Sequence, residues 1–231
     1  MRVNLLALTL LTAASTALAA PLPRLPASAA TPDALIPNGW KVQQRLRADF
    51  NADGLTDTLL VAQSTDPRNV HPPREDGYAW NGNPRLLVGA FARRDGRVQL
   101  AFQSAVITRR TSPTMEDPFG SLELFGRGFR LRLQEFYSMG SWTAGSVTFN
   151  VRWQDGCFRV IGYDRSMVHR ATLDSETVSV NFLTGRMQVV LDNAGAEPNT
   201  NRVERWSAYP GQRRVCVQDV TSGLEFRRDL P

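Results

Sequence analysis

The sequence has few of the residues on which common catalytic and metal-binding motifs depend. It contains two histidines, two cysteines and a single lysine, Lys41. His71 and His169 do not occur in a His-x-x-x-His or similar ligand spacing, which argues against a catalytic zinc site. The serine elbow, the Ser-x-x-Lys motif and phosphate-binding glycine loops are also missing. The sequence therefore favours a non-enzymatic protein.

Long hydrophobic runs are missing too, and the longest one lies close to the N-terminus. Arg2 precedes the apolar run Leu5–Leu11, and Ala17-Leu18-Ala19 forms an A-x-A cleavage pattern. This arrangement predicts a secretory signal peptide over residues 1–19, with a core too short to span a membrane. We therefore expect a periplasmic or secreted protein without a transmembrane segment, cleaved near Ala19.

The positive charge of the chain comes almost wholly from arginine. The formal net charge is +5, and the arginines are scattered among Asp and Glu without a long basic run. A nucleic-acid-binding domain usually concentrates its basic residues in a patch or stripe. We therefore expect no nucleic-acid partner, and an acidic envelope surface such as lipopolysaccharide or peptidoglycan stays a weaker alternative.

The composition changes twice along the chain. Residues 20–37 are rich in Pro, Ala, Ser and Thr and show no periodicity, so we interpret them as a linker that precedes a single β-rich domain over residues 38–231. No stretch of this domain keeps a helical period. Short apolar or alternating segments instead predict two series of antiparallel strands. The first series is 42–50, 58–63, 85–91 and 98–102, and the second is 121–125, 129–136, 147–153, 158–163, 177–182, 187–191, 203–209 and 215–217.

These segments predict a mainly β fold with little helix. The turns Asp95-Gly96 and Asp155-Gly156 are typical of hairpins, so the strands should form two meander units. Three arrangements of the two units stay open at this point: propeller-like blades side by side, a sandwich, or an open barrel.

The stretch 49–57 has the composition of a calcium loop. Calcium takes six to eight oxygen ligands, so a short loop must offer oxygens at alternating positions, and Gly54 suits the sharp turn that such a loop makes. The ligands that we expect are Asp49, Asn51, Asp53, the carbonyl group of Leu55, and Asp57. The alternative is an Asx-rich turn that binds nothing.

The segment after the loop is predicted to be a strand and not a helix. The twelfth position, where an EF-hand has a bidentate Glu, is Leu60 in the apolar run that begins at Thr58. The segment DFNADGLTDTLLV therefore resembles the strand-loop-strand calcium motif of FG-GAP and VCBS repeats. That resemblance implies a structural Ca²⁺ at the entrance to a β-sheet.

The second half of the chain resembles an uncharacterised family of secreted bacterial proteins. The resemblance rests on the segments Phe149–Gly156, Phe158–Asp164 and Ser179–Gly185. Members of that family tend to carry a D-x-N-x-D-G-x-x-D loop near the N-terminus, as this chain does. The resemblance implies no activity.

Cys157 and Cys216 both lie beside predicted strands. In an oxidising compartment an even number of cysteines predicts a disulfide, here Cys157–Cys216. Two buried free thiols are the alternative.

One segment between two predicted strands, 135–146, has the composition of a recognition loop. It is rich in Gly and Ser and carries aromatic residues, and the candidate contact residues are Glu135, Tyr137, Ser141 and Trp142. The alternative is a hairpin end whose aromatic side chains cover the edge of the core. Together these observations predict a non-enzymatic domain with a structural Ca²⁺ that binds a protein or an envelope glycan. A second hypothesis is a hydrolase of envelope polysaccharide or peptidoglycan that uses Glu135 with Glu116 or Asp117.

Overall fold

The computed structural model describes residues 22–73, 79–196 and 201–230 of the chain. Within these ranges the protein consists of antiparallel β-sheets, and its only helices are short 3₁₀ turns: η1 Asp33–Leu35, η2 Pro67–Asn69 and η3 Val217–Asp219. The prediction of a mainly β, antiparallel fold with little helix is therefore confirmed. The predicted signal peptide over residues 1–19 lies outside the described residues. No helix in the described ranges is long and apolar enough to cross a membrane.

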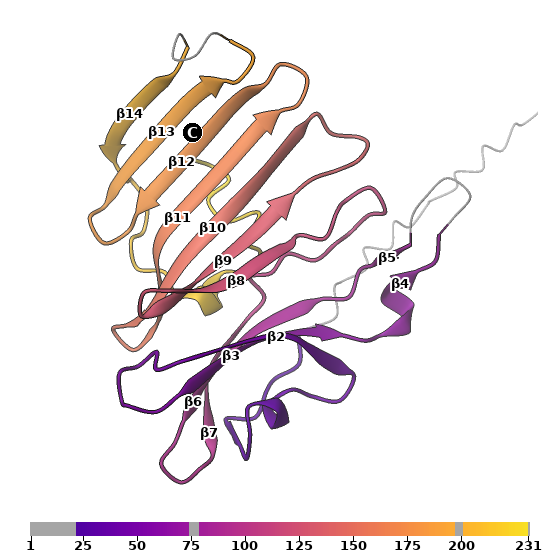
Figure 1. Ribbon diagram of the computed structural model, residues 1–231, viewed down its shortest axis with the longest axis vertical. Helices are drawn as coiled ribbons and strands as arrows, with labels where there is room; N and C mark the ends of the chain where they lie inside the picture. Colours follow the sequence, from indigo (N-terminus) through magenta and orange to yellow (C-terminus); the bar gives the residue numbers. More distant parts are fainter. Residues whose placement is uncertain (1–21, 74–78, 197–200, 231) are drawn as a thin grey trace, which may run out of the picture.

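The first sheet has five strands in the order β1-β7-β6-β3-β2 (Figure 1). Its middle strands, β3 and β6, are buried at almost every position and therefore on both faces. Four of the five strands are those that the sequence predicts in its first series. The bounds are β1 Ser28–Ala29, β2 Trp40–Ala48, β3 Asp57–Ser64, β6 Arg85–Ala92 and β7 Val98–Ser104.

The second sheet is a seven-stranded meander in which each strand pairs with its neighbour in the sequence, from β8 to β14. A separate pair, β4 Val70–His71 and β5 Trp80–Asn81, completes the described strands. The bounds in the meander are β8 Phe119–Phe125, β9 Gly128–Glu135, β10 Thr143–Gln154, β11 Cys157–His169, β12 Asp174–Asn181, β13 Arg186–Asn193 and β14 Val203–Ala208.

The two sheets share one apolar core. Alternate side chains of the seven-stranded sheet point inward and contact side chains of the five-stranded sheet, for example Phe129 against Phe102. At the sheet edges, the amide of Gln44 in β2 donates a hydrogen bond to the carbonyl of Leu122 in β8 at 2.7 Å. Neither described sheet closes on itself. The arrangement is sandwich-like. Of the three arrangements that the sequence left open, propeller-like blades, a sandwich and an open barrel, the structure therefore has the second.

The N-terminal segment covers the outer face of the five-stranded sheet. Leu25, Ala29 and Leu35 are buried there against Leu60 and Leu86. The described part of the segment that the sequence analysis interprets as a linker, residues 22–37, is thus packed as part of the fold. The irregular spacing of its apolar residues explains the error, because a chain that crosses a sheet without repeating structure has no period to detect.

The C-terminal segment after β14 covers the part of the inner face that the five-stranded sheet leaves free, and it runs behind the meander in Figure 1. The predicted strand 215–217 is wrong. Only Cys216 forms a bridge, with Arg159, and η3 begins at Val217. The segment is held mainly by burial of Val215, Val217 and Val220 rather than by a ladder of hydrogen bonds.

Candidate functional site

The predicted calcium loop is a compact turn between β2 and β3. Asp49 accepts hydrogen bonds from the amides of Asp53 at 3.2 Å and Gly54 at 2.9 Å, and Asn51 accepts one from Asp53 at 3.1 Å. The side chain of Asp53 in turn accepts a hydrogen bond from Leu55 N–H at 2.8 Å. Gly54, at φ +85°, has the left-handed conformation for which glycine is suited. Three of the predicted ligands, Asp49, Asn51 and Asp53, are therefore brought together.

Asp57 is turned away from this cluster into the protein. It is 1% exposed, and its two carboxylate oxygens accept hydrogen bonds from Phe50 N–H at 3.0 Å and Ala92 N–H at 2.9 Å. Burial raises the pKa of Asp57, and the N–H donors, Ala92 first, oppose that shift. Asp57 thus ties the loop to the end of β6.

The loop offers oxygen chemistry suited to calcium but few charged ligands in one place. Among the described residues, no group of three or more His, Cys, Asp or Glu side chains is placed to hold a metal. Asn51, Asp53 and the predicted carbonyl ligand Leu55 border a hollow of about 470 Å³ beside the β6–β7 turn. The same contacts suit an Asx-rich turn, so both predictions for this loop remain.

Two of the three carboxylates suggested for a hydrolase, Glu135 and Asp117, are bonded to an arginine. Glu135 accepts hydrogen bonds from Arg228 at 2.7 and 2.9 Å, and Asp117 accepts them from Arg85 at 2.7 and 2.6 Å. An ion pair of this bidentate kind occupies both carboxylate oxygens. The arrangement therefore gives no support to these groups as an acid–base pair.

The predicted recognition loop contains one well-exposed aromatic side chain. Trp142 is 67% exposed, and its ring lies 6.4 Å from that of His169. Tyr137 forms a bridge with Met115, and the Ser141 hydroxyl contacts Thr143. Tyr137 and Glu135 thus belong to the packing at the loop base, while Trp142 remains available for contact.

The sequence analysis did not identify the outward face of the seven-stranded sheet, where polar side chains gather in rows. Phe149, Tyr163 and Val178 point into the core, so the residues that alternate with them point outward. Strand register joins these outward positions into two rows. The first row is Arg130, Asn150, Gly162, Asn181 and Arg186, and the second is Arg132, Thr148, Asp164, Ser179, Gln188 and Trp206.

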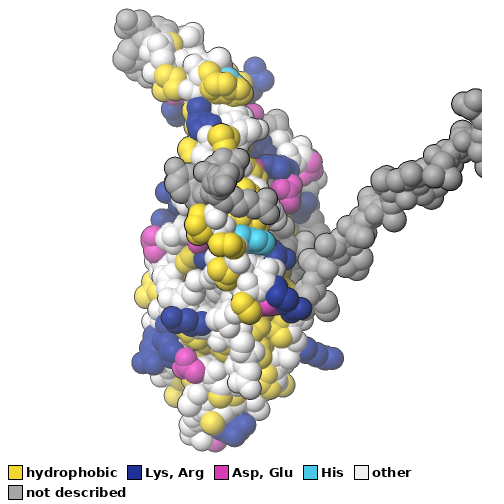
Figure 2. Space-filling view, turned by 90° about the vertical axis from the view of Figure 1, so that its right-hand side faces the viewer, with side chains coloured by type: hydrophobic (Ala, Val, Ile, Leu, Met, Phe, Trp, Pro, Cys, Tyr) yellow, Lys and Arg dark blue, Asp and Glu magenta, His cyan; other side chains and the backbone are white. Residues whose placement is uncertain are grey.

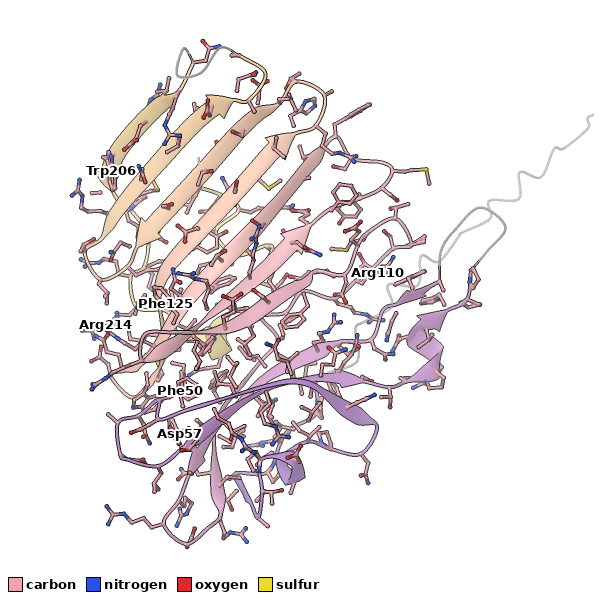
Figure 3. The ribbon with its side chains drawn as sticks, in the orientation of Figure 1. Phe50, Asp57, Arg110, Phe125, Trp206 and Arg214 are labelled. Carbon is pink, nitrogen blue, oxygen red and sulfur yellow. A yellow bond between two sulfur atoms is a disulfide. The ribbon has the colours of Figure 1, made fainter. Side chains whose placement is uncertain are left out.

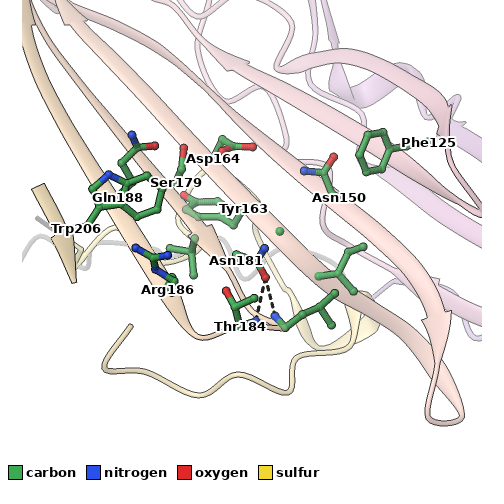
Figure 4. A pocket seen from close by; sticks show the side chains of 14 residues that line it. Phe125, Asn150, Tyr163, Asp164, Ser179, Asn181, Thr184, Arg186, Gln188 and Trp206 are labelled. Atoms are coloured by element: carbon green, nitrogen blue, oxygen red, sulfur yellow. Dashed lines mark hydrogen bonds between the residues drawn. The ribbon is translucent and has the colours of Figure 1, made fainter. Parts of the chain in front are cut away.

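These rows border a hollow of about 510 Å³. Gly162 has no side chain and Ser179 has a short one, so little fills the middle of the hollow; Figure 4 shows the side chains that line it. The hollow reaches from Phe125 on the edge strand β8 to Trp206 on the opposite edge strand β14, and Figure 3 labels both residues. It is therefore a groove that crosses the strands.

Each end of the groove has an arginine over an aromatic ring. The guanidinium of Arg130 lies 4.3 Å from the ring centre of Phe125, and that of Arg186 lies 4.7 Å from the ring of Trp206. The indole N–H of Trp206 donates to Glu204 at 2.6 Å, which fixes the ring on its strand. Aromatic rings held in this way offer contact area at little cost in conformational entropy.

Between the two ends, the floor of the groove has polar groups with unused hydrogen-bonding capacity. The side-chain oxygen of Asn181 accepts from the amides of Leu183 and Thr184 at 3.0 and 3.1 Å, which leaves its NH₂ group free to donate. Asp164 is half-buried, and its carboxylate has no hydrogen-bond donor within the part of the chain that the structure describes. The floor therefore offers both a donor and an acceptor to a ligand.

Sequence reasoning missed this groove because its lining residues come from six strands. The available sign was that Asn150 and Ser179 each alternate with buried apolar residues. Alternation alone shows that one face of a strand is exposed to solvent, but it does not show which residues lie side by side on neighbouring strands.

Comparison with known protein families, with curated proteins and with solved structures found no match to this chain.

Proposed function

We propose that this chain is a secreted or periplasmic protein that binds an envelope glycan, without cleaving it, on the outward face of the seven-stranded sheet. The observation that carries the proposal is the groove from Phe125 to Trp206, with its aromatic ends and its polar floor. Sugars present hydroxyl groups to hydrogen-bonding side chains and C–H faces to aromatic rings. A concave site with a few placed polar groups suits such a ligand.

A glycan suits this groove better than a folded protein partner does. The centre of a protein–protein interface is usually depleted in charge and rich in apolar residues. The floor here has four polar side chains, Asn150, Asp164, Asn181 and Gln188, beside the apolar Ile161 and Leu183, and its exposed aromatic rings lie at the two ends. The predicted signal peptide and the disulfide both favour a location outside the cytoplasm, where envelope glycans are found.

The proposal includes a structural Ca²⁺ at the β2–β3 loop, held by Asp49, Asn51, Asp53 and the Leu55 carbonyl. Support comes from the clustering of these side chains on one turn. Next to the loop, Phe50 packs edge-on against Phe158 of β11 at 6.0 Å. An ion that orders the loop would therefore stabilise the core beneath the binding sheet.

The test compares two exposed tryptophans that lie in different places. Trp206→Ala should weaken co-sedimentation with purified peptidoglycan sacculi by about tenfold or more, since loss of a well-placed aromatic contact costs about 1.4 kcal/mol or more. Trp142→Ala removes a similarly exposed indole that does not line the groove and should leave binding unchanged. The reverse result, with binding lost only in Trp142→Ala, would place the site on the predicted recognition loop.

A steric block tests the same groove without removing any contact. An added Cβ at Gly162 would meet the amide nitrogen of Asn150 at 3.1 Å, a contact that a small shift of that amide relieves. Gly162→Gln should therefore fill the groove floor and abolish binding, while the melting temperature stays close to that of the wild type.

A further inference from the structure

We infer that the glycan is an anionic polymer, with carboxylate or phosphate groups, and that Arg130 and Arg186 bind these groups at two separate positions along it. This inference rests on the proposed function and names the chemical class of its ligand.

Both guanidinium groups are oriented without being neutralised. Arg186 is exposed, stacks on Trp206 and has no acidic partner among the described residues. Arg130 stacks on Phe125 and uses only its Nε to donate to Asn150, at 3.0 Å. The ring contact holds each guanidinium beside the groove, and neither group donates to a carboxylate among the described residues. A guanidinium held in this way suits bidentate binding of carboxylate or phosphate.

The surrounding outward face is also positive. Its charged positions near the groove include more arginines than carboxylates, and the pair Arg159–Asp155 is already joined by a hydrogen bond. By contrast, charges of both signs are interspersed on the side of the molecule that Figure 2 shows. The remaining charged residues that register places on the outward face near the groove are Glu123, Arg130, Arg132, Arg152, Asp164, Arg186 and Glu204. The outward face beside the groove therefore has a small excess of positive charge, which favours an anion.

The two arginines are too far apart for one sugar ring. Arg130 is on β9 and Arg186 on β13, which are four strand spacings apart in the sheet order. At about 4.8 Å per spacing, their backbones are separated by about 19 Å. A ligand that contacts both must therefore be a chain of several sugars that crosses the strands.

Single-stranded nucleic acid is the other polyanion with planar groups, but the groove suits it less well. Sites of that kind place aromatic rings under successive bases. Here the rings lie only at the two ends, and the middle has the small or polar residues Gly162, Asp164 and Ser179.

The decisive experiment separates charge from sugar shape. Isothermal titration at low salt would compare a hexamer of galacturonic acid with its methyl-esterified form, and a glycerol phosphate polymer would test phosphate as the anion. We expect one of the two anionic polymers to bind about tenfold more tightly than the ester. Arg186→Gln and Arg130→Gln should each remove most of that preference. The control Arg47→Gln removes an exposed positive charge on the first sheet and should change nothing.

The outcomes for the inference and for the proposed function are distinct. Sacculi binding that depends on Trp206 but survives the Arg130→Gln/Arg186→Gln double substitution overturns the anionic inference and leaves glycan binding in place. Equal affinity for a galacturonate monomer and hexamer overturns the extended ligand. Absence of binding to sacculi and to every saccharide probe overturns the proposed function itself. Binding of oligo(dT) that is tighter than that of every saccharide and is lost in Arg186→Gln overturns the choice of a sugar.

Discussion

Asp53 and Asp57 stand four residues apart in one loop, yet their carboxylates have different environments. Asp53 is exposed and contacts only its own turn, whereas Asp57 is buried and holds the backbone of Phe50 and Ala92. The two residues therefore separate the proposed role in metal binding from a role in the architecture.

We predict that EDTA lowers the melting temperature and that added Ca²⁺ restores it, because a ligand that binds only the folded state stabilises it. Asp53→Ala should abolish this response. Asp57→Asn should instead cost about 1–3 kcal/mol with or without calcium, since an amide has one oxygen for two buried N–H donors. Differential scanning fluorimetry of the three proteins tests this, and a wild type that melts identically with and without chelator would show that the loop is a plain Asx turn.

At the scale of single residues, the sequence predicts what depends on local spacing. The clustering of Asp49, Asn51 and Asp53 follows from their alternation, and the Cys157–Cys216 pair follows from the count. The partner of Asp57 does not follow, because Ala92 is 35 residues away and is brought close only by the pairing of β3 with β6. Long-range pairing of this kind leaves no trace in a short window of sequence.

Among the elements, the N-terminal segment shows how much a short stretch without periodicity contributes. Leu35 in η1 is fully buried against Leu60 and Leu86, and the amide group of Gln103 bonds the backbone of Pro23 and Leu25. The segment thereby covers an apolar sheet face that would otherwise be exposed to water.

We predict that Leu35→Ala lowers the free energy of unfolding by about 2–5 kcal/mol, the usual cost of a cavity in a packed core. The matched control is Leu124→Ala at a site that is 52% exposed, where the change should stay within about 1 kcal/mol. Urea denaturation of both variants measures the difference. Equal effects in the two proteins would mean that residues 22–36 behave as the linker that their composition predicts.

The positions of the strands in the sequence were predictable, but the register in which neighbouring strands pair was not. Alternation in β9, β10 and β12 places the strands within a few residues of their observed bounds. The outward rows depend in addition on the bulge at Ile161, where the β10–β11 register shifts between Asn150 and Val151. One residue of slip exchanges the two faces of a strand, so the groove is fixed only when every bulge is known.

At the scale of the whole molecule, the C-terminal segment closes the core behind the seven-stranded sheet. Its attachments come from several places: the Tyr163 hydroxyl donates to Phe226 O at 2.7 Å, and Ser104 donates to Val217 O at 2.7 Å. The predicted disulfide Cys157–Cys216 is present and joins this segment to the start of β11. The segment has few backbone pairs of its own, so the covalent link carries much of its order.

We predict that the double substitution Cys157→Ser/Cys216→Ser lowers the free energy of unfolding by about 4 kcal/mol. The chain-entropy treatment gives this value for a loop with the observed sequence separation of 59. The double variant avoids a leftover thiol, and urea denaturation with and without reductant provides the measurement. Reductant should destabilise the wild type to the same extent and leave the variant unchanged.

A thiol reagent should label no cysteine in the denatured, unreduced wild type and should label two after reduction. Two labelled thiols without reductant would contradict the disulfide. Because the outward side chains of the two rows lie on the opposite face of the sheet from the core that this segment covers, glycan binding by the variant should persist at temperatures at which it stays folded.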